Sequence, residues 1–146
     1  KDINQEIILI VEEGKEEEAI TRLSRVGFDN CLGYLDSGIE SWKTAGYSTE
    51  SIRSIDPEQF INESSPNSQI IDVRDKSELI NGKFKSSKNI PLSKIDSHKK
   101  IDKNLTSYVY CAGGYRSVIA CSILKRDKFK QLVNVESGFS GISKLI

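Results

Sequence analysis

The sequence of 146 residues contains little cysteine and histidine and carries no formal net charge. Its three cysteines, Cys31, Cys111 and Cys121, are odd in number, widely spaced and without a CxxC pair, so they fit neither a disulfide framework nor a zinc site. The single histidine, His98, stands in a polar run and is expected to be a solvated loop residue. We therefore expect free thiols in a reducing compartment.

Large charged or apolar regions are also missing. The 21 basic and 21 acidic residues balance, so no broad basic field exists to attract nucleic acid or anionic lipid. No apolar run approaches the roughly 18 residues needed to span a bilayer, and the first residues lack the pattern of a signal peptide. With 37% hydrophobic and 29% charged residues, the composition predicts a globular protein, which we place in the cytoplasm.

An internal repeat becomes visible when the chain is compared with itself at an offset of 100 residues. A strand-like run, a glycine, an amphipathic helical stretch and a Ser-Gly turn recur in the same order and register. The matched segments are Ile7–Val11 with Ser107–Cys111, Gly14 with Gly114, Glu18–Leu23 with Val118–Ile123, and Ser37-Gly38 with Ser137-Gly138. The repeat predicts two copies of one strand, loop, helix and strand unit.

Only the second copy has preceding residues that complete a domain. A strand near Ser51–Ile55 leads into a helix with Asp56 as its N-cap and Pro57 at its first position. An apolar strand at Gln69–Val73 and a short helix around Ser77–Ile80 follow. Strands that alternate with helices predict an α/β fold with a mainly parallel central sheet flanked by helices.

The first copy begins almost directly on its strand. We therefore interpret residues 1–48 as the C-terminal half of a degenerate domain and residues 49–146 as a complete domain, joined through the polar segment Ser48–Ser51. A half-domain exposes a sheet edge, which a homodimer or docking on the second copy would cover.

The candidate chemistry lies in a loop between a strand and a helix. The strand delivers Cys111, and glycines allow a curled loop whose N–H groups point inward at a helix N-terminus. A cysteine held there has a lowered pKa and attacks as the thiolate. Arg116 adds a planar cation suited to an anionic sulfur donor. The other residues of this loop are Ala112, Gly113, Gly114, Tyr115 and Ser117.

Residues 50–146 resemble the rhodanese-like domains. The active loop of that family reads Cys-x-x-Gly-x-Arg, and Cys111, Gly114 and Arg116 match it. The likeness extends to Asp72-Val73-Arg74, Glu78, Gly82 and Asn89-Ile90-Pro91. Lys83 and Ser86 depart from the histidine and glycine that the family usually has, in a connection outside the loop.

This resemblance implies a sulfurtransferase. The thiolate of Cys111 would take a sulfane sulfur from thiosulfate or a low-molecular-weight persulfide, and pass it to a thiol or to cyanide. No metal or organic cofactor is implied. Two alternative functions stay open. The first is a non-catalytic binding or regulatory module, which rhodanese-like folds also form, and the second is a cysteine phosphatase, a class that includes enzymes with the same fold. The phosphatase is the weaker alternative, because those enzymes place five residues between cysteine and arginine, whereas only Ala112 to Tyr115 intervene here.

The repeat register shows what the first copy holds at the catalytic positions. Val11 stands at the position of the cysteine, and Glu16 stands at the position of the arginine. Further glutamates surround Glu16, so this surface is anionic and would repel a persulfide instead of binding it. We predict that this copy is inactive. An inactive half followed by an active domain is similar to the C-terminal region of metallo-β-lactamase-fold proteins fused to tandem rhodanese domains, some of which oxidise persulfides. This likeness implies such a domain upstream, within a larger sulfide-metabolising protein.

Several other residues admit two interpretations. Asp72 and Arg74 either support the catalytic loop or simply pair with each other at a buried strand end. Cys121 is expected in the core, with a role as a resolving thiol as the alternative. Cys111 itself could be a buried packing residue, but the conjunction of strand, cysteine, glycines, arginine and helix start favours chemistry. Trp42 is expected to cover the core of the first copy.

Overall fold

The computed structural model describes residues 2–97 and 101–146, so His98 lies outside the described residues. The chain divides into two compact units, Lys1–Glu50 and Ser51–Ile146. Within the described ranges, no helix combines the length and the apolar character that crossing a membrane requires.

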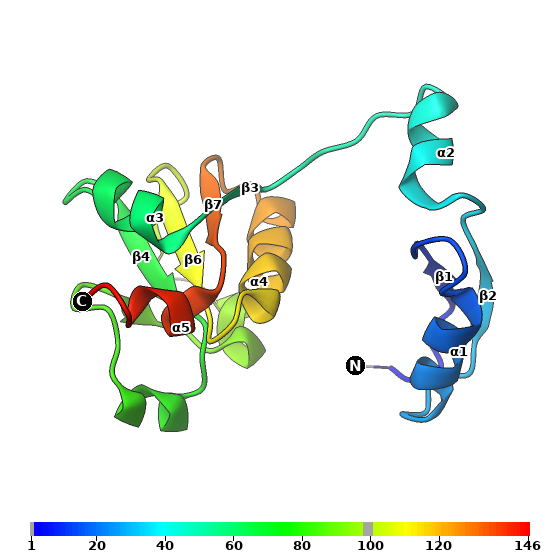
Figure 1. Cartoon of the computed structure of the whole chain (residues 1–146), viewed down its shortest axis with the longest axis horizontal. Helices are drawn as coiled ribbons and strands as arrows, with labels where there is room; N and C mark the ends of the chain where they lie inside the picture. The colour runs from blue at the N-terminus through cyan, green and yellow to red at the C-terminus, as the bar shows by residue number, and fades with distance from the viewer. Residues whose placement is uncertain (1, 98–100) are drawn as a thin grey trace. The chain divides into compact units, whose positions relative to one another are not determined.

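The second unit is built on a five-stranded sheet in the order β3-β7-β6-β4-β5, and every strand pair is parallel. The observed fold is therefore the predicted α/β fold, with helices on both faces (Figure 1). Its elements are β3 (Arg53–Ile55), α3 (Pro57–Glu63), β4 (Gln69–Asp72), η1 (Lys76–Asn81), β5 (Lys88–Asn89), η2 (Leu92–Ser97), β6 (Ser107–Tyr110), α4 (Tyr115–Arg126), β7 (Leu132–Val135) and α5 (Gly138–Ile142).

The two faces of this sheet carry separate apolar clusters, because successive strand residues point in opposite directions. In β4, Ile70 packs toward α3 and α5, whereas Ile71 packs toward α4 and η2. Tyr108 and Tyr110 of β6 belong to the α3 and α5 side. The next residue, Cys111, therefore faces the α4 side, together with the fully buried Cys121.

Local capping explains where the shorter helices begin. The side chain of Asp56 accepts a hydrogen bond of 2.8 Å from the Gln59 amide, and Pro57 occupies the first turn of α3, as the sequence predicts. The short helix expected around residues 77–80 is the 3-10 helix η1. A capping box formed by Asp75 and Glu78 stabilises its N-terminus.

The first unit contains a two-stranded parallel sheet and two helices. Its elements are β1 (Ile7–Leu9), α1 (Glu16–Ser24), β2 (Cys31–Tyr34) and α2 (Gly38–Thr44). Much apolar surface stays open, since Ile8 is 70% exposed and Leu32 is 59% exposed. Trp42, expected over a core, is 40% exposed and instead contacts Tyr47 at a ring distance of 4.6 Å. The physical reason is that this unit has too few elements to enclose a core.

The first unit repeats part of the pairing of β6 with β7. Ile8 pairs with Gly33 as Tyr108 pairs with Val133, and Leu9 pairs with Tyr34 as Val109 pairs with Asn134, so these partners differ by 100 in residue number. The first pair departs from this register, because Ile7 pairs with Cys31 whereas Ser107 pairs with Leu132. The turn before the last helix repeats as well. Ser37 and Ser137 have φ angles of 56° and 57°, and Gly38 and Gly138 have φ angles of 58° and 50°.

Strand β1 is shorter than the expected run through Val11. Strand β6 is paired on both sides, by β4 and β7, whereas β1 is paired only with β2. Hydrogen bonds on one edge alone stabilise fewer residues in strand conformation, and the glutamates after Val11 favour solvent. The strand therefore ends at Leu9.

Candidate active site

The candidate nucleophile lies at the carboxyl edge of the second unit's sheet. Strand β6 ends at Tyr110, and Cys111 follows it directly. Gly114 has a φ of 106° and precedes the first residue of α4, Tyr115. This left-handed conformation suits glycine, and it lets the chain turn from strand into helix within four residues. Parallel open sheets bind their ligands at this edge.

The sulfur of Cys111 faces the loop that follows it. The Gly114 amide donates a hydrogen bond to Sγ at 3.1 Å, and the Ser117 hydroxyl lies 3.6 Å from Sγ. Burial acts to raise the pKa of Cys111, but hydrogen bonds from the Ser117 hydroxyl and from the amides of Ser117, Gly114 and Gly113 outweigh it and lower the pKa. The residue is only 1% exposed, so its sulfur lies beneath the loop and within the apolar cluster on the α4 side.

The first turn of α5 holds the backbone of this loop in place. The amides of Phe139 and Ser140 donate to the carbonyls of Cys111 and Ala112, at 2.7 and 3.0 Å. Gly138 makes this approach possible, because a β-carbon there would lie 2.3 Å from the Cys111 carbonyl oxygen. The sequence showed Ser137-Gly138 only as a repeated turn, and its role beside the cysteine depends on the tertiary contact.

Arg116 is held by a residue that the sequence analysis did not place in the site. Its two terminal nitrogens donate to the Glu78 carboxylate at 2.6 and 2.7 Å. Glu78 matched a family position, which was the available signal, but 38 residues separate the pair. The planar fork expected to meet a sulfur donor is thus engaged by Glu78, and the pair links η1 to the start of α4.

The Glu78 carboxylate is expected to stay ionised far into the acid range. Its hydrogen bonds with Arg116 lower its pKa from 4.5 to about 2, against the opposing effect of burial. A depressed folded pKa means that the pair stabilises the fold above pH 4.5 and that this contribution disappears as the pH falls toward 2. We expect an NMR titration of the side-chain carboxyl carbon to give a midpoint near 2 in the wild type, and a return toward 4.5 in Arg116→Met. An unchanged midpoint would contradict the ion pair.

Asp72 and Arg74 form a buried ion pair beside the loop. They are 0% and 2% exposed, and the Arg74 guanidinium donates to both Asp72 oxygens and to the Gly82 carbonyl. It also lies 4.1 Å from the ring centre of Phe139, the residue whose amide bonds the Cys111 carbonyl. Among the described residues, no hydrogen bond or ion pair joins Asp72 or Arg74 to Cys111 or Arg116. The pair contacts the element that bonds the loop, α5, and not the loop itself.

The remaining predicted residues separate into surface and core. Tyr115 is 87% exposed at the loop rim. Cys121 is fully buried, and burial raises the pKa of its thiol to about 12, which fits packing and not a resolving thiol. Cys31 lies in the first unit and is partly buried. Among the described residues, no group of three or more metal-ligating side chains is placed to hold an ion.

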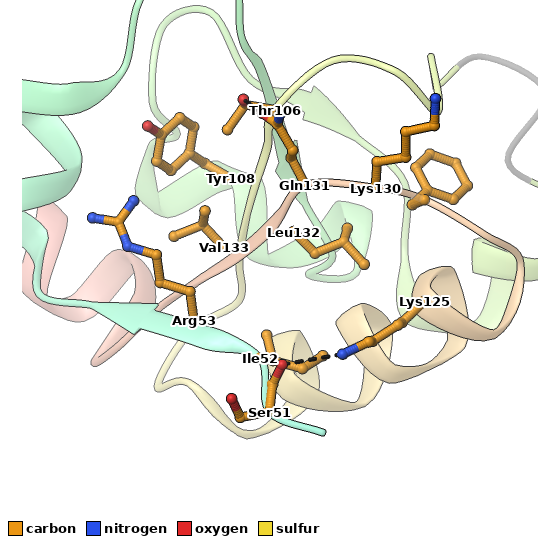
Figure 2. A pocket seen from close by; sticks show the side chains of 11 residues that line it. Ser51, Ile52, Arg53, Thr106, Tyr108, Lys125, Lys130, Gln131, Leu132 and Val133 are labelled. Carbon is orange, nitrogen blue, oxygen red and sulfur yellow. Dashed lines mark hydrogen bonds between the residues drawn. The ribbon is translucent and has the colours of Figure 1, made fainter. Parts of the chain in front are cut away.

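A separate cavity of about 470 Å³ opens at the amino ends of β3, β6 and β7 (Figure 2). Its floor is apolar, with Ile52, Leu132 and Val133. At its rim, Lys125 donates to the Ser51 carbonyl at 3.1 Å, and Arg53 is bound by Glu63 at 2.7 Å. These contacts engage two of its cationic groups, and the cavity lies at the end of the sheet opposite Cys111, so it is not the site of the loop's chemistry.

Comparisons with known proteins find relatives over part of the chain. Two curated proteins share limited identity with the chain: the uncharacterized protein YqhL of Bacillus subtilis, 33% identical over 72 residues, and a probable molybdopterin-synthase adenylyltransferase of Porphyra purpurea, 30% identical over 107 residues. The matches cover 49% and 69% of this chain. The chain spans 57% and 28% of the length of these two relatives.

Solved structures agree with this fold. A rhodanese-like domain protein from Staphylococcus aureus is 33% identical with a TM-score of 0.56, covering 62% of this chain and 91% of its own. A rhodanese-related protein from Thermoplasma volcanium is 30% identical with a TM-score of 0.59, covering 64% and 92%. The model of the rhodanese-like domain matches residues 56–145, more than half of the sequence. The chain therefore belongs to the rhodanese-like domain family.

Proposed function

We propose that this protein is a sulfurtransferase that carries a sulfur atom on Cys111 as a persulfide. The observation that carries the proposal is the placement of Sγ, which receives the Gly114 amide at 3.1 Å at the start of α4 and has a lowered pKa. Backbone donors in such a position stabilise an anion without having to reorganise. This loop is therefore suited to bind a persulfide anion.

The loading step balances with thiosulfate as the donor. The Cys111 thiolate attacks the outer sulfur of thiosulfate, the sulfur–sulfur bond of the donor breaks, and its electron pair leaves with sulfite. The enzyme becomes Cys–S–S⁻, and no oxidant is consumed. The short loop, with four residues between Cys111 and Arg116, supports sulfur over phosphate as the group that it encloses.

A direct test is the mass of the intact protein after incubation with thiosulfate. The sulfurtransferase predicts a gain of one sulfur atom, which cyanide then removes as thiocyanate. The alternative, a non-catalytic binding or regulatory module, predicts no adduct. Because Cys121 is buried with a raised pKa, the added sulfur is expected on a peptide that contains Cys111.

Arg116 offers a second test with a matched control on the same helix. We expect Arg116→Met to lower kcat/KM for thiosulfate by about 10- to 100-fold, the size of a lost hydrogen bond to a charged group. Arg126→Met removes a cation that also pairs with carboxylates, Asp96 and Asp127, but lies at the far end of α4. Its kcat/KM should stay within about twofold of the wild type, and equal losses in both variants would contradict a specific role for Arg116.

For the first unit, we propose the C-terminal half of a degenerate rhodanese-like domain. The repeated strand register and the paired φ angles of Ser37-Gly38 and Ser137-Gly138 support it. At the position that corresponds to the Cys111 loop, Glu16 accepts from the Gly14 amide at 3.1 Å, so a carboxylate occupies the amide that corresponds to the Gly114 donor. This unit is proposed to be inactive. An upstream metallo-β-lactamase-fold domain stays a prediction from sequence resemblance.

A further inference from the structure

An apolar groove of about 530 Å³ borders the catalytic loop on its outer side. Gly113 and Gly114, whose amides face the Cys111 sulfur, form one rim. Val118 and Ile119 of α4 form an apolar wall, and they are 47% and 49% exposed. Exposed apolar side chains next to a reactive loop indicate a contact surface for a substrate.

The groove also contains an incompletely bonded amide. Asn134 of β7 lines it and is only 3% exposed. Its Nδ2 donates to the Ser54 hydroxyl at 3.1 Å, while its buried Oδ1 has no partner among the described residues. Rotating the amide by half a turn would leave Nδ2 unpaired instead, so one polar atom needs a partner in either orientation. Because Oδ1 itself has almost no exposed surface, a ligand in the groove would satisfy this amide once the side chain turns toward it.

Charge restricts what can occupy the groove. Glu136 is an exposed acid on its lining, and none of the described lining residues is basic. The site cation, Arg116, is engaged by Glu78 and does not line the groove. An anionic thiol such as glutathione would meet repulsion here, whereas a neutral or basic ligand would not.

We propose that this groove binds the sulfur acceptor, and that the acceptor is a cysteine in an extended polypeptide segment with apolar neighbours and basic flanks. The inference rests on the proposed sulfurtransferase function and names its acceptor class. A polypeptide supplies apolar side chains for Val118 and Ile119, N–H and C=O groups for Asn134, and positive charge for Glu136. A small anionic donor needs none of these and meets the loop directly.

The transfer step requires no further reactant. The acceptor thiolate attacks the outer sulfur of the Cys111 persulfide, and the bond between that sulfur and Sγ breaks. The electron pair returns to Sγ, so the enzyme leaves as the Cys111 thiolate and the acceptor as a persulfide. The acceptor's proton goes to solvent before the attack.

The test uses the full chain, loaded with thiosulfate and desalted, with four acceptors. Two are blocked pentapeptides with a central cysteine between leucine and valine, and with either lysine or glutamate at both ends; the others are glutathione and cyanide. Rates are compared per thiolate, because nearby lysine lowers a thiol pKa. We expect the lysine peptide to react about tenfold faster than glutathione and about threefold faster than the glutamate peptide. These ratios are modest because salt screens the interaction between the exposed Glu136 and the charges of each acceptor.

Two sets of variants locate the effect. We expect Val118→Gln with Ile119→Gln to slow the lysine peptide about tenfold by removing apolar contact, while cyanide reacts at an unchanged rate. The matched control is Leu145→Gln with Ile146→Gln, which removes two side chains that are 45% and 65% exposed at the C-terminus. Glu136→Lys should reverse the preference between the two peptides.

The outcomes distinguish a failure of the acceptor proposal from a failure of the proposed sulfurtransferase function. If thiosulfate produces no persulfide, the sulfurtransferase proposal fails and the groove proposal fails with it. If the persulfide forms and cyanide removes it, but glutathione matches the lysine peptide or the groove variants transfer sulfur at the wild-type rate, then only the acceptor proposal is overturned.

Discussion

Cys111→Ser is expected to eliminate persulfide formation and to lower thiosulfate-to-cyanide turnover by at least about 1,000-fold, the scale of losing a catalytic nucleophile. Serine is nearly isosteric, and its hydroxyl can take the place of the sulfur beside the Gly114 amide and the Ser117 hydroxyl, so the fold should persist. The hydroxyl cannot replace the thiolate, because its pKa lies far above neutrality and an oxygen does not form the stable sulfur–sulfur bond. Thiocyanate release measures turnover, and intact mass measures loading.

The other cysteines supply the controls for this result. Cys31→Ser changes a partly buried residue in the first unit and should leave turnover intact. Cys121→Ser places a hydroxyl in a fully buried apolar site, so stability should fall while each folded molecule still loads one sulfur. Turnover that survives Cys111→Ser would show that another thiol carries the sulfur, and it would also refute the proposal that the first unit is inactive.

Asp72→Ala is expected to be the most destabilising of the single substitutions considered, at about 3–5 kcal/mol of unfolding free energy. It leaves the Arg74 guanidinium, 2% exposed, without its carboxylate inside the protein. It also removes the acceptor of the Arg74 amide, which donates to Asp72 Oδ1 at 3.0 Å. That loss is a large part of the total stability of an ordinary domain. Urea unfolding followed by circular dichroism measures it.

A double variant separates loss of the pair from loss of an isolated charge. Asp72→Ala with Arg74→Met removes both charges, so it should unfold at a higher urea concentration than Asp72→Ala alone. Arg53→Met, which breaks an ion pair whose side chains are 56% and 36% exposed, should leave the urea midpoint almost unchanged. A double variant less stable than Asp72→Ala would mean that Arg74 contributes mainly through its contacts with Phe139 and Tyr110.

The local sequence was sufficient to predict that Cys111 lies in a tight loop between a strand and a helix, because the residues of that loop are neighbours in the chain. An apolar strand, Cys111, two glycines and Arg116 occupy adjacent positions, and strand, turn and helix preferences act over that same distance. The N-cap at Asp56 follows for the same reason. Glu78 and Gly138 were not predictable in this way, since 38 and 27 residues separate them from the groups that they contact, Arg116 and Cys111.

The sequence by itself determined the α/β class and the order of its elements, and it predicted the repeat at an offset of 100 residues and Cys111 as the nucleophile. Periodicity, capping and turn chemistry are short-range properties, and one chain displays them directly. Only the tertiary structure decided that Glu78 holds Arg116, that Arg74 packs on α5, and that an unpaired Asn134 amide lies beside the loop. Those contacts arise when parallel strands bring their carboxyl ends to one edge, where segments distant in sequence meet.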